Sequence, residues 1–254
     1  MLEGVNDSGW GGELPLAPNL SKGLGYVHLP SNVIEGIARS SSLDSFGQPA
    51  VFLDRDGVLI EDMGFLRKPE DIRILPGVTQ ALRLLAAKFR LVVTTNQSGI
   101  ARGLFNEETL LEIHQHLAKL LAAKGVAIDA YYYCPHLEGG TVTAYRVECE
   151  CRKPKPGMLQ QASINMGLSL ADSYMVGDNP RDAQAGLSAG AKGVIIGETG
   201  AGCPNFVMVA KNMLEAAELI LADRPESNDS KSDMIGNSAG SITMSNREKR
   251  SCSL

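Results

Sequence analysis

The stretch VFLDRDGVLI, residues 51–60, is the feature that most constrains the fold. Its apolar run is typical of a short buried strand, and the run ends in Asp54 and Asp56, with Gly57 just beyond. A strand that ends this way delivers two carboxylates to one edge of a sheet. Carboxylates at positions i and i+2 suit a hard cation with oxygen ligands, and one of them can attack or move a proton. The alternative interpretation is a solvated turn that carries two unrelated acids.

Apolar strands alternate with helical segments through the middle of the chain. Each strand is short and apolar on both faces, which indicates a parallel sheet covered by helices. We therefore predict an α/β fold, a three-layer Rossmann-like parallel sheet with helices on both faces and no large cap. The predicted strands are 51–53, 91–95, 127–134, 173–178 and 192–197, and the predicted helices are 78–89, 106–125, 157–167 and 180–190.

Polar side chains follow the strands at the edge where ligands bind in such folds. Asp54, Asp56, Thr95 and Asp178 all stand at predicted strand ends, so we expect them to meet in one crevice. The hydroxyl of Thr95 and the residues behind it, Asn96 to Gly99, offer donors suited to phosphate oxygens. The neighbouring Thr94 is the alternative that could face the site instead.

Two further polar segments lie near predicted strand ends. In CRKPKPG, Lys153 stands between an arginine and a proline on a loop that cannot be helical, so its ammonium can be held in place. In MVGDNPRD, Asp178 ends a strand and Asp182 begins the next helix. Asp182 can either contribute to a metal site or only stabilise the first helical turn. Together these groups predict a Mg²⁺ site with the ammonium group of Lys153 beside it.

Three of the five cysteines lie close together in the sequence. The ligand types of Cys134, His136, Cys149 and Cys151 match a closed tetrahedral Zn²⁺ site, which would be structural. The alternative is three free thiols and a surface histidine. The other histidines of the central region, His114 and His116, are predicted to be solvent or packing residues.

In order along the chain, these motifs resemble those of the haloacid dehalogenase-like phosphohydrolases. The matching residues are DRDGV from Asp54, a strand-end threonine at Thr95, Lys153, and GDN with Asp182. The segments TNQSGIARG, CPH…CECRKPKPGM and MVGDNPRDAQAG are similar to the branch of D,D-heptose 1,7-bisphosphate and histidinol-phosphate phosphatases, and the resemblance covers residues from about 50 to about 200. The branch usually carries a lysine where this chain has Asn179.

The resemblance implies a Mg²⁺-dependent phosphatase with a covalent intermediate. Asp54 would be the nucleophile, and Asp56 would act as general acid and then base. Mg²⁺ would be held by the Asp54 carboxylate, the Asp56 carbonyl and Asp178. The transferring phosphoryl group would be bound by Thr95 and Lys153, and the rest of the substrate by further polar side chains: Asn96, Arg102, Arg152 and Asn179.

The resemblance also implies a substrate class. The expected substrate is D-glycero-D-manno-heptose 1,7-bisphosphate, dephosphorylated at C7 towards activated heptose for surface glycans. Histidinol phosphate is the enzymatic alternative. An alternative from another class is a zinc-stabilised interaction protein whose phosphatase site is vestigial.

Composition sets the remaining expectations. The 254 residues carry a formal net charge of −5, with Lys and Arg scattered, so we expect no nucleic-acid partner. No apolar run approaches the ~20 residues that cross a bilayer, and no secretory signal is visible, so we expect a cytoplasmic monomer without a membrane partner. The predicted domains are a flexible extension at 1–48, the phosphatase domain at 49–222 and a disordered polar tail at 223–254.

Overall fold

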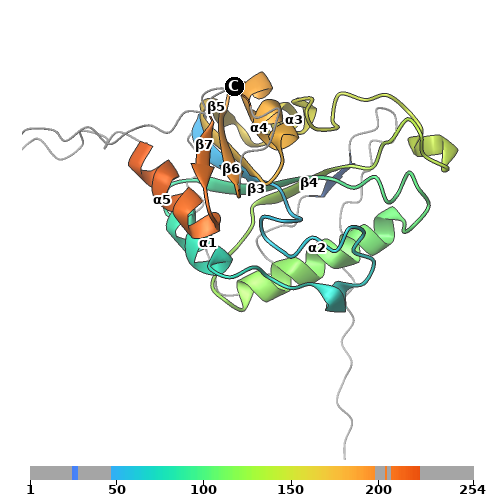
Figure 1. Ribbon diagram of the computed structural model, residues 1–254, viewed down its shortest axis with the longest axis horizontal. Coiled ribbons are helices and arrows are strands. Elements are labelled where there is room, and N and C mark those ends of the chain that lie inside the picture. The colour runs from blue at the N-terminus through green and yellow to red at the C-terminus, as the bar shows by residue number, and fades with distance from the viewer. Residues whose placement is uncertain (1–24, 28–46, 198–203, 205–206, 224–254) are drawn as a thin grey trace, which may run out of the picture.

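The computed structural model describes residues 25–27, 47–197, 204 and 207–223 of the chain (Figure 1). Within them, one seven-stranded sheet has the order β1-β4-β3-β2-β5-β6-β7. All neighbours pair in parallel except β1, which is antiparallel to β4. The strands are β1 (Gly25–Val27), β2 (Gln48–Leu53), β3 (Arg90–Asn96), β4 (Ala130–Cys134), β5 (Leu168–Gly177), β6 (Lys192–Ile196) and β7 (Met208–Ala210).

Helices cover both faces of this sheet, as predicted. In Figure 1, α3 and α4 lie above the sheet, and α1, α2 and α5 lie below it. The helices are α1 (Val78–Ala86), α2 (Glu107–Ala122), α3 (Gly157–Met166), α4 (Pro180–Ala189) and α5 (Met213–Asp223), with short 3-10 turns η2 (Pro69–Asp71) and η3 (Thr143–Tyr145). None of the described helices has the length and apolar character that crossing a membrane requires.

Strand β2 explains why the strands are apolar on both faces. Val51 and Leu53 point into the core between the sheet and α1, α2 and α5. Ala50 and Phe52 point into the core between the sheet and α3 and α4. All four side chains are fully buried. Because successive side chains of a strand alternate between faces, a central strand with helices on both sides must be apolar throughout.

The direction in which successive strands are added to the sheet reverses beside β2. The chain runs from β2 to β3 and β4 on one side, and then returns to β5 on the other side of β2. In open parallel sheets, ligands bind beyond the carboxyl ends of the strands at this reversal. The carboxyl ends of β2 and β5, which carry Asp54 and Asp178, are therefore the place to look for a site.

The structure adds elements that the sequence analysis does not assign. Strand β1 lies inside the predicted extension 1–48, and α5 ends at Asp223, one residue beyond the predicted domain. Strand β1 has only three residues, too few to show a period. The other residues of the extension and of the tail lie outside the described residues. Helix α1 also ends earlier than predicted, at Ala86, because β3 begins at Arg90.

Candidate active site

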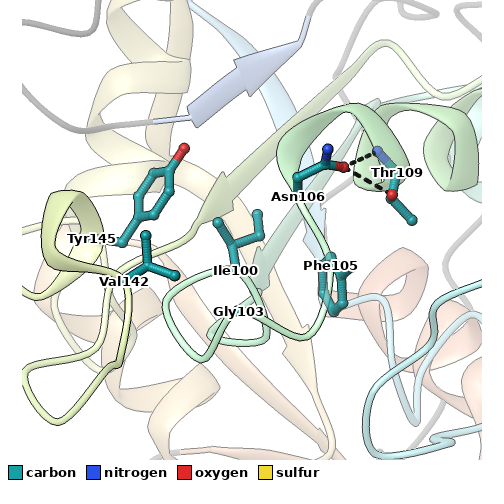
Figure 2. Close-up of a pocket in the computed structure, with 7 residues that line it drawn as sticks. All are labelled: Ile100, Gly103, Phe105, Asn106, Thr109, Val142 and Tyr145. Atoms are coloured by element: carbon teal, nitrogen blue, oxygen red, sulfur yellow. Dashed lines mark hydrogen bonds between the residues drawn. The ribbon is translucent and has the colours of Figure 1, made fainter.

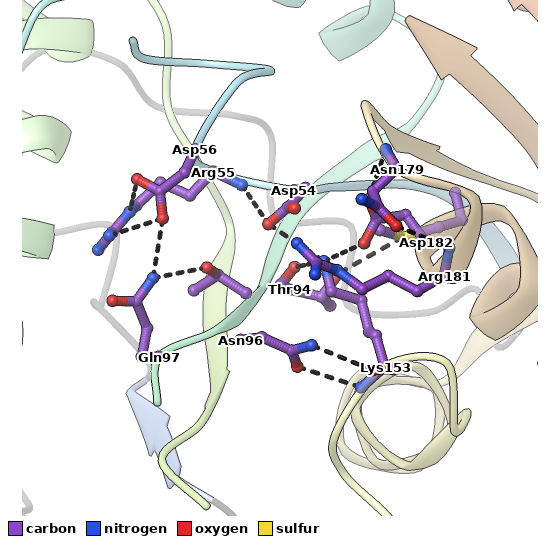
Figure 3. Close-up of polar contacts among 12 residues, drawn as sticks. Asp54, Arg55, Asp56, Thr94, Asn96, Gln97, Lys153, Asn179, Arg181 and Asp182 are labelled. Carbon is purple, nitrogen blue, oxygen red and sulfur yellow. Dashed lines mark hydrogen bonds and ion pairs between the residues drawn. The ribbon is translucent and has the colours of Figure 1, made fainter. Parts of the chain in front are cut away.

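A polar cavity of about 260 Å³ opens at the carboxyl ends of β2, β3 and β5. Four acids, the loop after β3 and two arginines form its wall, so it gathers most of the residues predicted for the site. Figure 3 shows the polar contacts of several of these residues, Asp54, Asp56 and Gln97 among them. The lining residues are Asp54, Asp56, Asp62, Gly64, Phe65, Thr95, Asn96, Gln97, Ser98, Gly99, Arg152, Asp178, Asn179 and Arg181.

Lys153, which does not itself line the cavity, links two buried carboxylates. Its Nζ lies 3.1 Å from Oδ1 of Asp54 and 2.8 Å from Oδ1 of Asp182. The same ammonium donates to the Thr94 carbonyl oxygen at 2.8 Å, so its three protons have three acceptors. The Lys153 and Asp182 side chains are fully buried, and that of Asp54 is 7% exposed. A lysine held this way is a fixed positive charge next to Asp54.

The charges of this network shift one another's pKa values. Burial raises the pKa of Asp54 to about 6, and the nearby ammonium of Lys153 opposes that rise. Burial alone would lower the pKa of Lys153, but the carboxylates of Asp54 and Asp182 outweigh it and raise this pKa. Burial, and then the charge of Asp182, also raise the pKa of Asp178. Crowded acids of this kind favour a bound cation, which would stabilise their charged forms.

Helix α4 positions Asp182, which takes part in two arrangements. Its Oδ2 accepts from the Asn179 backbone N–H at 3.1 Å, and the Asn179 side chain accepts from the Arg181 N–H at 3.3 Å, which forms a capping box. Its other oxygen binds Lys153. One oxygen each of Asp54, Asp178 and Asp182 lie within 4.8 Å of one another. The geometry therefore agrees with both alternatives for Asp182: its side chain caps the first turn of α4, and it also belongs to the cluster of acids.

The loop after β3 lines the opposite wall. Thr95 lies on the cavity, whereas the Thr94 hydroxyl donates to the sulfur of Met175 at 3.5 Å. The side chain of Asn96 forms two hydrogen bonds of 3.1 Å with the backbone of Lys153. Asn96 therefore holds the lysine loop against β3, and Thr95 is the hydroxyl that faces the cavity.

Asp56 is held by donors that the sequence does not single out. The buried Arg55 binds both of its carboxylate oxygens, with Nε 3.1 Å from Oδ1 and Nη2 2.9 Å from Oδ2. The side chain of Gln97 donates to Oδ2 of Asp56 at 2.9 Å and to the Thr95 hydroxyl at 2.8 Å. Beneath them, Arg55 Nη1 lies 3.3 Å from Nε2 of the buried His114.

The arginines near the cavity differ in position. Arg152 lines the cavity and donates to the His136 carbonyl oxygen at 3.3 Å. Arg181, which the sequence analysis does not name, also lines it. Arg102 does not line the cavity; its guanidinium carbon lies 5.8 Å from the centre of the Phe65 ring, on the cavity wall. Arg152 and Arg181 are therefore the cations placed to meet a bound anion.

The predicted cysteine cluster is assembled in the loop between β4 and α3. The Sγ atoms of Cys149 and Cys134 lie 3.6 Å apart, and those of Cys149 and Cys151 lie 3.4 Å apart. Nδ1 of His136 lies 3.3 Å from the Cys151 sulfur and 3.7 Å from the Cys134 sulfur. A tetrahedral Zn²⁺ with Zn–S bonds of about 2.3 Å would space its sulfurs about 3.8 Å apart. The four side chains therefore fit the ligand shell of a zinc ion.

A second hollow, of about 430 Å³, lies on the other side of the loop after β3 (Figure 2). It lies between that loop, the first turn of α2 and the η3 segment, and Asn106 caps α2 there by accepting from the Thr109 N–H at 2.9 Å. None of its lining residues is an acid, a lysine or an arginine. Of these two cavities among the described residues, the one at the carboxyl ends of β2, β3 and β5 is therefore the one lined by charged side chains.

Some of the site could not be found from the sequence. Gln97 was visible only as part of the loop after β3, and Arg55 only as the residue between two aspartates. Arg55 follows Asp54 beyond the end of β2, so no periodic pattern of the sequence indicated that its side chain would be buried. His114 was predicted to be solvent or packing, and it is fully buried, with its ring stacked on Tyr131 at 4.8 Å.

Comparison with known proteins gives consistent names. A family model described as "HAD-hyrolase-like" matches residues 150–205. A D-glycero-beta-D-manno-heptose-1,7-bisphosphate 7-phosphatase of Yersinia pestis is 44% identical over 153 residues, which are 60% of this chain and 81% of that protein. The protein of the same name from Escherichia coli K12 is 40% identical over 179 residues, 70% of this chain and 92% of that protein.

Solved structures agree with this comparison. A D,D-heptose 1,7-bisphosphate phosphatase from B. bronchiseptica, complexed with magnesium and phosphate, is 36% identical with a TM-score of 0.61, and the match covers 69% of this chain and 99% of that one. A putative HAD-like phosphatase from Mesorhizobium loti is 31% identical with a TM-score of 0.67, covering 79% of this chain and 92% of that one.

Proposed function

This chain belongs to the haloacid dehalogenase-like hydrolases and is a phosphatase, and from this premise we propose that it removes the 7-phosphate of D-glycero-β-D-manno-heptose 1,7-bisphosphate. The relatives of that name from Yersinia pestis and Escherichia coli K12 match it over 81% and 92% of their length. The observation that carries the proposal is the buried carboxylate of Asp54, which faces a polar cavity with Lys153 beside it.

The reaction that these residues support has two steps. In the first, Asp54 attacks phosphorus, the bond to the ester oxygen breaks, and Asp56 gives that oxygen a proton. In the second, Asp56 takes a proton from a water whose oxygen attacks the aspartyl phosphate and releases Asp54. The same carboxyl serves both steps because the two proton transfers are opposite.

Residues at the carboxyl edge would hold Mg²⁺. The Asp54 and Asp178 carboxylates and the Asp56 carbonyl are the proposed ligands, and Asp182 supports them from the far side through Lys153. The carboxylate oxygens of Asp54 and Asp178 lie within 4.8 Å of each other, which fits two ligands of one divalent cation. The ion would neutralise charge so that two anions can meet. One solved relative contains magnesium and phosphate, which supports this assignment.

Other cavity residues would bind the substrate. Thr95, which lines the cavity, is proposed to contact the transferring phosphoryl group, where charge accumulates; Lys153, which is buried beside Asp54 and does not line the cavity, would contribute its positive charge there. Arg152 and Asn179 line the cavity farther out and are proposed to contact the sugar or its second phosphate. Arg102 does not line the cavity, so it could contact the substrate only from its position over the ring of Phe65. We propose that Asn96 acts through its hydrogen bonds to the Lys153 backbone.

We also propose a structural Zn²⁺ on Cys134, His136, Cys149 and Cys151. Four protein ligands leave no open position, so the ion would fix the loop rather than take part in the reaction. Arg152 and Lys153 follow the last cysteine directly, which links the zinc site to the cavity. A small phosphorylated sugar as substrate, a monomeric state and a cytoplasmic location complete the proposal.

The test compares phosphate release from heptose 1,7-bisphosphate and from histidinol phosphate in the presence of Mg²⁺. We expect a strong preference for the heptose and a loss of about 10³-fold or more in Asp54→Asn, because the amide is not a nucleophile. The matched control is Asp71→Asn, which makes the same change at an exposed aspartate outside the cavity.

Three outcomes would contradict the proposal. A preference for histidinol phosphate would assign the other substrate, and activity that survives in Asp54→Asn would remove the nucleophile. Absence of phosphate release from every ester tested, with Mg²⁺ present, would favour the alternative of an interaction protein with a vestigial site.

A further inference from the structure

The carboxylate of Asp56 has an unequal set of hydrogen bonds on its two oxygens. Oδ2 accepts from Arg55 Nη2 at 2.9 Å and from Gln97 Nε2 at 2.9 Å. Among the described residues, Oδ1 accepts only from Arg55 Nε, at 3.1 Å. A carboxylate has about four acceptor positions, two on each oxygen. The position left open is therefore on Oδ1, and the Asp56 side chain is 23% exposed and lines the cavity.

Arg55 holds the plane of this carboxylate from beneath. Its side chain is only 1% exposed, and the two parallel contacts to Asp56 fix the orientation as well as the distance. A third nitrogen of the guanidinium, Nη1, lies 3.3 Å from Nε2 of His114, which is fully buried and does not line the cavity. Arg55 therefore orients Asp56 from a position outside the cavity lining.

Gln97 joins Asp56 to the phosphate-binding wall. Its two amide protons are both used, one on Asp56 and one on the hydroxyl oxygen of Thr95 at 2.8 Å. Because the Thr95 hydroxyl already accepts from Gln97, its own proton is free to point into the cavity. One side chain therefore sets both the hydroxyl that can donate to a phosphoryl oxygen and the carboxylate beside it (Figure 3).

We propose that Arg55 and Gln97 are positioning residues that hold Asp56 so that Oδ1 is the atom that exchanges the proton. When the bond between phosphorus and the ester oxygen breaks, the proton on Oδ1 passes to that oxygen. When water forms its bond to phosphorus and the bond to Asp54 breaks, a proton of the water returns to Oδ1. This inference rests on the proposed phosphatase function and on the role given there to Asp56.

The test uses Gln97→Leu with two phosphate esters that differ in the leaving group. A nitrophenolate leaves without a proton, whereas an alkoxide needs one, so only the alkyl ester depends on the acid in the first step. The value of kcat/KM reports steps up to the first irreversible one, here transfer to Asp54. We expect kcat/KM for glycerol 3-phosphate to fall about 10-fold to 100-fold, and that for 4-nitrophenyl phosphate to fall about 3-fold or less.

The value of kcat separates the second step. It should fall for both esters, because both form the same aspartyl phosphate and need the base to hydrolyse it. The control Gln160→Leu makes the same change at an exposed position of α3 and should leave kcat and kcat/KM unchanged for both esters. Arg55→Lys is a second variant, since an ammonium cannot provide the two parallel bonds of a guanidinium, and it should show the same dependence on the leaving group.

Equal losses of kcat/KM for the two esters in Gln97→Leu would overturn the proposal, because a purely structural defect does not distinguish leaving groups. A wild-type enzyme that hydrolyses the aryl ester but no alkyl phosphate, heptose 1,7-bisphosphate included, would also overturn it, since Asp56 would then deliver no proton to the leaving oxygen. If the leaving-group effect is present but heptose 1,7-bisphosphate is not a substrate, the inference about Asp56 stands and the proposed substrate fails.

Discussion

At the scale of single residues, Gly57 has the tightest requirement near the proposed metal site. Its backbone has φ of +77°, and a Cβ added there would lie 2.0 Å from Oδ2 of Asp178. We expect Gly57→Ala to cost about 1 to 2 kcal/mol through the left-handed backbone and, in addition, to displace Asp178. Phosphate release should then need much more Mg²⁺, which a titration of activity against Mg²⁺ measures.

Gly125 provides the matched control for this prediction. Its φ of +75° is almost the same, but a Cβ there would meet nothing within 4 Å. Gly125→Ala should therefore lose a similar amount of stability and keep the wild-type requirement for Mg²⁺. If both variants show the same Mg²⁺ titration, the position of Asp178 does not depend on the space above Gly57.

His114 should make stability depend on pH. Burial, and then the charge of Arg55, lower its pKa well below the ordinary value of 6.5. Below pH 6.5 the unfolded chain therefore binds a proton that the folded protein does not, so stability is lost as the pH falls. Between pH 7.5 and 5.5 this effect should remove about 1.4 kcal/mol from the free energy of unfolding.

Urea unfolding of His114→Gln at the two pH values tests this effect. Glutamine keeps an acceptor for Arg55 but does not titrate, so the variant should lose less stability than the wild type over the same interval. His116→Gln, on the same helix, should behave like the wild type. An unchanged pH dependence in His114→Gln would show that this histidine binds its proton in both states.

At the scale of elements, the loop between β4 and α3 depends on its four proposed zinc ligands. We expect about one zinc per chain after dialysis, and a large loss of zinc in Cys149→Ser, measured by atomic emission. Activity should fall with it, because Arg152 and Lys153 follow Cys151 directly. Cys252→Ser, a cysteine outside the described residues, is the control and should retain zinc. A wild-type protein without zinc would contradict the proposed site.

The sequence predicted the elements whose side chains follow a clear period. All five predicted strands and all four predicted helices are present, since long apolar runs and helical spacing determine them. Strands β1 and β7 have three residues each and show no period. Helix α5 was not assigned, although its buried Met213, Ala216, Ala217 and Ile220 have helical spacing.

Some residues of the candidate site could likewise be predicted from the sequence, and others could not. Acids at strand ends, such as Asp54 and Asp178, could be predicted because parallel strands bring their carboxyl ends to one edge. The contact of Arg55 with His114 could not, since it joins residues 59 positions apart through packing that has no local pattern. The same holds for the two amide contacts of Gln97.

At the scale of the whole molecule, β1 closes one edge of the sheet. It pairs antiparallel with Tyr131, Tyr132 and Tyr133 of β4. Without it, β4 would present unpaired backbone groups along an apolar strand, which promotes association between chains. We expect deletion of residues 1–46 to produce oligomers or aggregates, measured by size-exclusion chromatography with light scattering.

Deletion of residues 1–20 is the matched control. It shortens the chain but retains Gly25–Val27, so it should elute with the full-length protein, which we propose is a monomer. Identical elution of all three forms would show that β1 does not protect the edge. Deletion of 1–46 leaves β2 intact, because that strand begins at Gln48.

The position of β2 in the centre of the sheet also has a consequence for synthesis of the chain. Asp54 leaves the ribosome early, but its neighbours Lys153, Asp178 and Asp182 come more than ninety residues later. Neither half of the chain contains both Asp54, the proposed nucleophile, and Lys153, which forms an ion pair with it. A nascent or truncated chain that stops before β5 is therefore expected to be inert towards phosphate esters, so hydrolysis begins only once the sheet has been completed on both sides of its first parallel strand.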